Sequence, residues 1–97
     1  MSDDALFKAL SDETRRLILD ELQRREGQPL FEICSRLTAH HGITMSRQAI
    51  SQHLQVLEDA GLVHTSRHGR TKVHVFTPGP LRSIVTRWPI PPTEQEK

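Results

Sequence analysis

One stretch of this chain decides its fold, and it reads SRQAISQHLQVLEDAGLV over residues 46–63. Its apolar residues recur at a spacing of three or four positions and fall at Ile50, Leu54 and Leu57. This spacing predicts an amphipathic helix with one buried face. Ser46 can cap the first turn of the helix and Gly61 can end it. We therefore expect a helix over residues 46–60.

The opposite face of this helix is polar, with five side chains in a single strip: Arg47, Gln48, Ser51, Gln52 and Gln55. A face that only meets solvent is usually rich in Glu and Lys, and this strip contains neither. Gln can bond adenine through two hydrogen bonds and Arg can do the same with guanine. The strip is therefore predicted to contact the base edges of DNA.

Three further helices are predicted before this stretch. The first surrounds Leu6, Phe7 and Leu10, and the second runs from about Glu13 to Arg25 after the capping residues Ser11 and Asp12. The third begins at Pro29 and ends at Gly42, with an apolar stripe of Leu30, Ile33, Cys34 and Leu37.

The pattern changes after Gly61, where residues 62–67 and 71–77 are rich in Val, Thr and Phe and predict a β-hairpin. A three-residue loop at 68–70 would place Arg67 opposite Thr71, Val63 opposite Val75 and His64 opposite His74. A last short helix is predicted from the stripe Leu81, Ile84, Val85 and Trp88. Residues 89–97 contain three prolines and are expected to form a disordered tail.

These elements predict a mainly α fold with a β-hairpin wing, in the order four helices, hairpin, helix. That order is typical of a winged helix-turn-helix, here one domain over residues 1–88. In such a unit the fourth helix enters the DNA major groove and the hairpin loop reaches the neighbouring backbone. Arg70 and Lys72 on the wing are therefore expected to contact DNA along with the strip on the fourth helix.

Length and composition limit the other possibilities. The chain has 97 residues, a net charge of +1 and a single cysteine, so we expect one domain without an internal disulfide. Residues 36–88 carry seven Lys and Arg against two Asp and Glu, a basic middle that suits a polyanion. No apolar run approaches the length of a membrane span, and the start does not resemble a signal peptide, so the cytoplasm is the expected location. No nucleophile elbow, phosphate loop or HExxH motif occurs, so no catalytic residue and no enzyme activity are expected.

Three blocks of sequence resemble the ArsR/SmtB family of bacterial repressors. Residues 46–63 resemble its recognition helix and first strand, residues 7–19 its N-terminal signature, and Gly69-Arg70 its wing. The resemblance implies a homodimer that binds a two-fold, inverted-repeat operator in double-stranded DNA and represses transcription. It carries Ser46, Gln48, Ser51 and Gln52 over as DNA contacts, with Arg70 as the wing contact. The implied dimer seam, built by the first and last helices, consists of Leu6, Phe7, Leu10, Leu81, Ile84, Val85 and Trp88.

The chain departs from the family pattern in two places. Seven residues, 38–44, separate Leu37 from Met45 where the family commonly has about one, so the third helix or the following turn is extended. Many family members bind metal through a Cys-x-Cys pair on the third helix, but here only Cys34 is present, and a buried core cysteine is expected. The family's other metal site needs Asp and His on the last helix, which has neither, so no metal or other cofactor is expected.

The six histidines have structural interpretations. His40 and His41 can cap the third helix, His64 and His74 can face each other on the hairpin, and His53 can support the fourth helix from its half-buried side. His68 at the wing tip can contact phosphate. Two alternatives to a DNA-binding repressor of this kind stay open: a winged helix that binds a protein, and a repressor that responds to metal or to redox state. Nothing in the residues identifies a small-molecule inducer.

Overall fold

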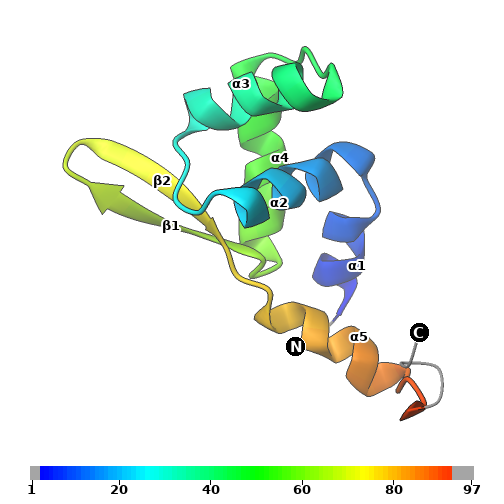
Figure 1. The fold of residues 1–97 in the computed structure, drawn as a ribbon. Coiled ribbons are helices and arrows are strands. Elements are labelled where there is room, and N and C mark those ends of the chain that lie inside the picture. The colour runs from blue at the N-terminus through cyan, green and yellow to red at the C-terminus, as the bar shows by residue number, and fades with distance from the viewer. Residues whose placement is uncertain (1–2, 93–97) are drawn as a thin grey trace.

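The computed structural model describes residues 3–92, and its elements follow the predicted order (Figure 1). The helices are α1 (Asp4–Leu10), α2 (Glu13–Arg24), α3 (Leu30–His41), α4 (Arg47–Asp59) and α5 (Arg82–Arg87). The strands are β1 (Val63–His68) and β2 (Thr71–Phe76), and a 3-10 turn, η1 (Gly79–Leu81), leads into α5. The winged helix-turn-helix prediction is confirmed. Within residues 3–92 no helix is both long enough and apolar enough to cross a membrane.

Local capping chemistry sets the ends of the helices. The Asp12 carboxylate accepts a hydrogen bond from the Arg15 backbone N–H at the start of α2, and the Ser46 hydroxyl accepts one from Ala49 at the start of α4. Gly42 ends α3 with φ +67, the left-handed conformation that glycine adopts without strain.

The apolar faces of the helices meet in one core, as their spacing predicts. Its largest fully buried apolar side chains come from α2, α3, α4 and the residue before β1: Ile18, Leu22, Ile33, Leu37, Ile50, Leu54, Leu57 and Leu62. This core holds α4 with its polar face outward. Cys34 packs against the edge of the core and is half-buried, not fully buried as predicted, because α3 turns its side chain toward a surface hollow.

The hairpin register differs by one residue from the prediction. Val63 pairs with Phe76, His64 with Val75, and His68 with Thr71. The physical reason is the loop, which contains only Gly69 and Arg70; Gly69 has φ +67, a conformation that allows a two-residue turn. His64 and His74 therefore do not face each other.

His74 instead joins the hairpin to the body of the protein. It is buried and forms a two-way backbone bridge with Gln28, which lies in the α2–α3 connection, at N···O distances of 3.1 and 2.8 Å. Its Nδ1 also lies 3.0 Å from the Gln28 carbonyl oxygen. This backbone bridge fixes β2 relative to the connection between α2 and α3.

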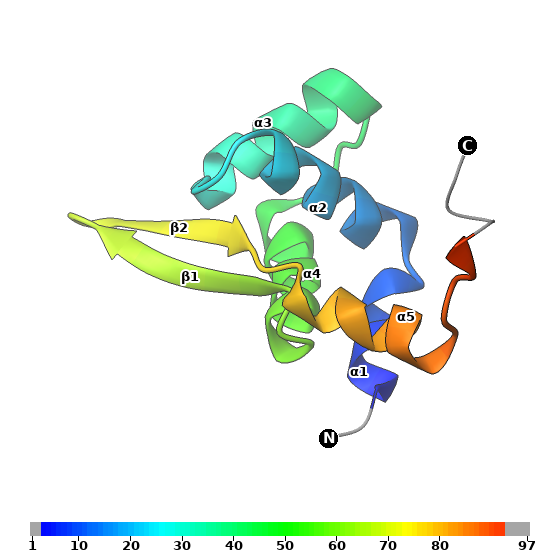
Figure 2. The same cartoon turned by 60° about the horizontal axis from the view of Figure 1, so that its bottom comes forward.

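The C-terminal part is shorter than predicted, because residues 79–81 form the 3-10 turn and α5 covers only Arg82–Arg87. Figures 1 and 2 both show α5 beside α1, at the end of the molecule away from the hairpin tip. Of the tail expected to be disordered, residues 89–92 are exposed, and residues 93–97 lie outside the described part of the chain.

Candidate nucleic-acid interface

The recognition strip on α4 is exposed along its whole length. All five of its residues are exposed while Ile50, Leu54 and Leu57 on the opposite face are buried: the strip consists of Arg47, Gln48, Ser51, Gln52 and Gln55. Because the core holds one face of α4, the strip points to solvent in a fixed direction. The structure therefore brings together the five helix residues that the sequence singled out.

The side chains of the strip differ in how free they are to bind. Gln55 Nε2 donates to Asp59 Oδ1 at 3.0 Å, so its amide is partly occupied. The amides of Gln48 and Gln52 make no hydrogen bond to any other described residue. Ser46, just before the strip, is exposed, but one lone pair of its hydroxyl accepts the capping bond from Ala49. Gln48 and Gln52 are thus the side chains best prepared for two-bond contact with a base.

The wing carries positive charge toward its tip. Arg70 lies in the turn and Lys72 on the first part of β2, and both are exposed. Arg67, which the site prediction missed, pairs across the hairpin with Lys72, and its Nη1 lies 3.4 Å from the Arg70 carbonyl oxygen. The signal was present in the sequence as an arginine at the predicted end of the first strand. His68 is also exposed beside the turn.

His53 supports α4 from the face away from the strip, as predicted. Its ring is half-buried, and Nδ1 lies 3.0 Å from Arg15 Nη1. The partner Arg15 is on α2, a residue that the sequence did not single out because 38 positions separate the two.

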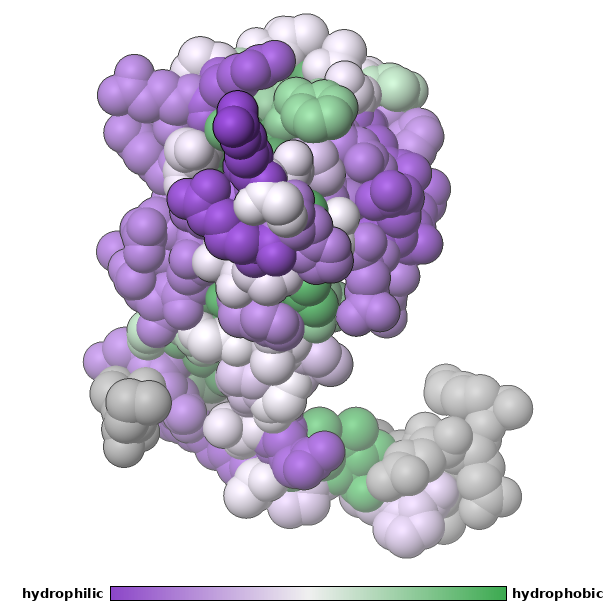
Figure 3. Space-filling view, turned by 90° about the vertical axis from the view of Figure 1, so that its left-hand side faces the viewer, coloured by the Kyte–Doolittle hydropathy of each residue, from purple (hydrophilic) through white to green (hydrophobic). Residues whose placement is uncertain are grey.

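The residues expected to form a dimer seam lie on α1, η1 and α5, with Trp88 just after α5. Val85 and Trp88 are 47% and 56% exposed, and the others are half-buried except Leu6, which is buried in the chain's own core. The rings of Phe7 and Trp88 pack with centroids 6.0 Å apart, and the Arg87 guanidinium lies over Trp88 at 4.5 Å. Figure 3 shows a mostly hydrophilic surface over the hairpin side, with a hydrophobic patch at the lower end where α5 lies.

The cysteine and histidine positions bear on metal binding. Burial raises the pKa of the Cys34 thiol above its ordinary value, and the nearby Arg47 charge offsets this only in part. The thiol therefore stays protonated at neutral pH and is a poor metal ligand. His40 and His41 bond the buried Glu21 carboxylate at 3.0 and 2.9 Å, so their main partner is a side chain of α2 and not the end of α3 as predicted. Within residues 3–92 no group of three His, Cys, Asp or Glu residues is placed to hold a metal ion.

An outward-facing polar helix beside a basic hairpin, both held on a compact helical core, defines the class: a winged helix-turn-helix DNA-binding protein. Residues 10–66 match the family described as a helix-turn-helix domain. The chain is 49% identical over 85 residues to the HTH-type transcriptional regulator YuzN of Bacillus subtilis (strain 168), and the match covers 88% of this chain and 92% of that protein.

Solved structures agree. An ArsR-like transcriptional regulator from Rhodococcus sp. RHA1 matches with a TM-score of 0.76 at 34% identity, over 88% of this chain and 72% of that one. An ArsR family transcriptional regulator matches with a TM-score of 0.72 at 25% identity, over 87% and 79% of the two chains. This chain therefore belongs to the ArsR-like family of winged-helix transcriptional regulators, which act by binding DNA and are not enzymes.

Proposed function

We propose that this protein is a sequence-specific repressor that binds an inverted-repeat operator in double-stranded DNA as a homodimer. The observation that carries the proposal is the recognition strip: five exposed polar side chains with no acidic residue among them, backed by a fully buried face. Two free amides, Gln48 and Gln52, supply base contacts, and the N-terminal Arg47 supplies a guanine or phosphate contact.

The wing adds contacts to the DNA backbone, which depend on charge and not on the DNA sequence. Arg67, Arg70 and Lys72 place three cations within one hairpin end, and Arg67 and Lys72 face each other across the strands. Cations of this kind neutralise phosphates and release counterions, which makes binding weaken steeply as salt rises. They favour DNA over a protein as the partner of the strip.

The apolar seam on α1, η1 and α5 supports the proposed dimer. Val85 and Trp88 are large apolar side chains left exposed at the same end of the molecule, and an exposed apolar patch is a usual sign of a contact between proteins. A two-fold dimer through this seam presents two copies of α4 to DNA, and half-sites about 34 Å apart match one helical turn.

Selection of bound sequences from a random DNA pool at two salt concentrations tests the proposal, on protein whose mass in solution has been measured. We expect an inverted repeat bound by a dimer. Loss of sequence preference at every salt concentration would contradict the proposal and favour a protein partner for the strip.

Two variants separate base contacts from backbone contacts in the same assay. Gln52→Ala is expected to relax the preference at one base position by about 1 to 3 kcal/mol. Arg70→Ala is expected to weaken binding to all DNA sequences alike. It is also expected to make the affinity less dependent on salt, by the amount that corresponds to about one phosphate contact. An unchanged base preference in Gln52→Ala would mean that the strip is not the surface that distinguishes sequences.

A further inference from the structure

Arg15 joins three helices through one guanidinium group. Its Nε donates to the Ala9 carbonyl oxygen at 3.0 Å and its Nη2 to the Lys8 carbonyl oxygen at 2.9 Å, both in the last turn of α1. Its Nη1 donates to His53 Nδ1 on α4 at 3.0 Å. The planar guanidinium, with its donors in a rigid fork, is suited to holding several acceptors at fixed positions.

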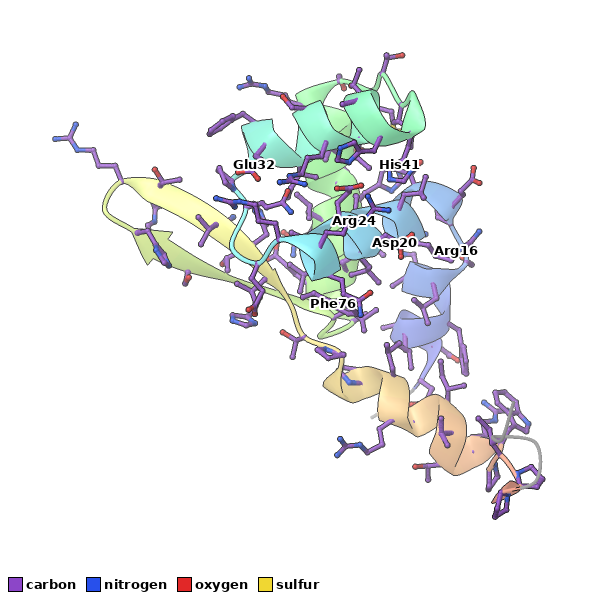
Figure 4. All side chains as sticks on the ribbon, viewed as in Figure 1. Arg16, Asp20, Arg24, Glu32, His41 and Phe76 are labelled. Atoms are coloured by element: carbon purple, nitrogen blue, oxygen red, sulfur yellow. The ribbon has the colours of Figure 1, made fainter. Side chains whose placement is uncertain are left out.

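The two backbone contacts anchor the end of α1. The last carbonyls of a helix have no partner within the helix. Here Arg15 donates to two of them, and Ser11 also donates to the Lys8 carbonyl. The neighbouring Arg16, labelled in Figure 4 at the corner between α1 and α2, bonds the Leu10 carbonyl oxygen at 2.7 Å. The corner is therefore tied down by two consecutive arginines, and only Arg15 continues to α4.

The third contact fits only one form of the His53 ring. A guanidinium can only donate, so this geometry requires Nδ1 of His53 to accept and the ring proton to be on Nε2. A proton on Nδ1 would place a donor against a donor and a positive charge beside a positive charge. The Arg15 contact is therefore available only to neutral His53.

A carboxylate also lies near the His53 ring. Asp12 Oδ2 lies 3.9 Å from His53 Nδ1, beyond hydrogen-bond distance, and is already the cap of α2. Arg15 and Asp12 are the charged groups that face His53 from the α1–α2 corner. From α3 and β1, the core residues packed with α4 are apolar and include Ile33, Leu37 and Val63. A proton on Nδ1 would therefore be repelled by Arg15 at 3.0 Å and attracted by the Asp12 carboxylate at 3.9 Å.

His53 is the residue that follows Gln52 on α4, and its side chain is half-buried on the inner side while Gln52 is exposed. We infer that Arg15 and His53 are positioning residues that hold α4 at a fixed rotation against α1, and that protonation of His53 releases α4 and lowers the affinity for DNA. This inference rests on the proposed function, because the proposed dimer seam includes α1 and the proposed base contacts lie on α4. The distance between the two strips of a dimer then depends on this contact.

The test compares the wild type with His53→Asn, Arg15→Lys and His64→Asn. In His53→Asn the new amide oxygen can accept from Arg15 but does not titrate, and in Arg15→Lys the single ammonium group cannot reach three acceptors at once. His64→Asn is the control, since His64 is exposed on β1 and its ring lies 2.7 Å from the Thr77 hydroxyl, away from Arg15. Affinity for the selected operator is measured between about pH 8 and about pH 5.5, the range in which histidines ordinarily gain a proton. Circular dichroism at each pH verifies that the variants stay folded.

We expect acid to weaken DNA binding by the wild type and by His64→Asn about two- to tenfold more than binding by His53→Asn. Arg15→Lys is expected to bind more weakly at every pH. Equal pH profiles for the wild type and His53→Asn would overturn the inference while leaving the repressor proposal standing.

A measurement without DNA keeps the two proposals separate. In nitrogen-15 NMR spectra of the free wild type between about pH 8 and about pH 5.5, we expect the backbone signals of Ala9 and Leu10, which follow the two carbonyls that Arg15 holds, to shift, and to stay in place in His53→Asn. If the wild type bound no DNA sequence even at about pH 8, the proposed function would fail. The NMR titration would then decide the positioning role alone, and unmoved signals in the wild type would refute it.

Discussion

Glu21 shows how one buried carboxylate joins α2 to the end of α3. Its side chain is fully buried, with Oε2 at 3.0 Å from His40 Nδ1 and 2.9 Å from His41 Nε2. The Arg36 guanidinium lies 3.5 Å from the other oxygen. Figure 4 shows His41 at the end of α3 that lies beside α2. An ionised carboxylate is costly to bury unless it is paired and hydrogen-bonded, and α3 supplies both kinds of contact.

These contacts have a consequence for stability against pH. Burial alone would raise the pKa of Glu21, but the hydrogen bonds from His40 and His41, with the charges of His40 and Arg24, hold that pKa below its ordinary value of 4.5. A lowered pKa in the folded state means that ionised Glu21 stabilises the fold above pH 4.5. The contribution is lost as the pH falls through the lowered pKa.

Glu21→Gln is therefore expected to reduce the free energy of unfolding at neutral pH by about 1.5–3 kcal/mol, because an amide is a weaker acceptor and turns a donor toward a histidine. Urea denaturation from pH 7 down to about pH 3.5 measures the difference, which we expect to shrink below pH 4.5. The exposed Glu26→Gln is the control and is expected to change stability little at any pH. A constant difference down to the lowest pH would show that the charge of Glu21 is not what stabilises the fold.

The connection from α3 to α4 shows how an element absorbs extra sequence. Four of its seven residues, 38–41, lengthen α3 to His41, and Gly42 then ends it. Ile43 returns to the core, with its N–H bonded to the Leu37 carbonyl at 3.1 Å and its carbonyl accepting from Thr38 Oγ1 at 2.8 Å. The added length is therefore taken up by a helical turn and a closed cap, and α4 still begins at a capping serine.

Ser46 has two separable functions at the start of α4, the capping bond and the proposed DNA contact. Ser46→Ala is expected to lower the free energy of unfolding by about 1 kcal/mol, because the first turn loses its cap. Ser46→Asp keeps a capping oxygen, so its stability is expected to match the wild type, while its negative charge next to the phosphates weakens DNA binding. Denaturation and DNA titration of both variants measure the two effects. Undiminished DNA binding by Ser46→Asp would place Ser46 away from the DNA.

At the scale of the whole molecule, the two ends have opposite character. One end carries the basic wing, and the other carries α1 and α5, with Val85 exposed on α5 and Trp88 exposed just after it. α5 has only six helical residues and none of them is buried, although Ile84 touches the core and Trp88 packs on Phe7. A helix this short is not stable by itself in water, so it depends on packing partners. A second copy of the chain, as proposed above, supplies that packing.

Val85→Ser tests this assembly because Val85 is 47% exposed and takes no part in the Phe7–Trp88 pair. We expect the dimer dissociation constant to rise about tenfold or more, and DNA affinity to fall at a given protein concentration. Sedimentation measures the mass. Phe31→Ser, which also replaces an exposed apolar residue but on α3, is the control and is expected to leave the dimer unchanged. A dimer of wild-type strength in Val85→Ser would remove α5 from the interface.

The order of the elements, the caps at Asp12, Gly42 and Ser46, and the outward strip on α4 were all predictable from the sequence. Helical periodicity and capping act within a few residues, so they can be recognised without knowing the fold. The family resemblance carried by residues 46–63 also held, because that segment combines the helix, its caps and the start of the wing.

Only the tertiary structure decided which distant residues meet. The contacts of Glu21 with His40 and His41, of Arg15 with His53, and of Gln28 with His74 join positions 19 to 46 residues apart. The predicted hairpin register was wrong by one residue, because a turn of two residues and a turn of three fit the same sequence pattern. In the observed register, β2 also forms backbone hydrogen bonds with Gln28. Local sequence specifies what each segment becomes, whereas the pairing of side chains depends on how the helices and the hairpin pack in three dimensions.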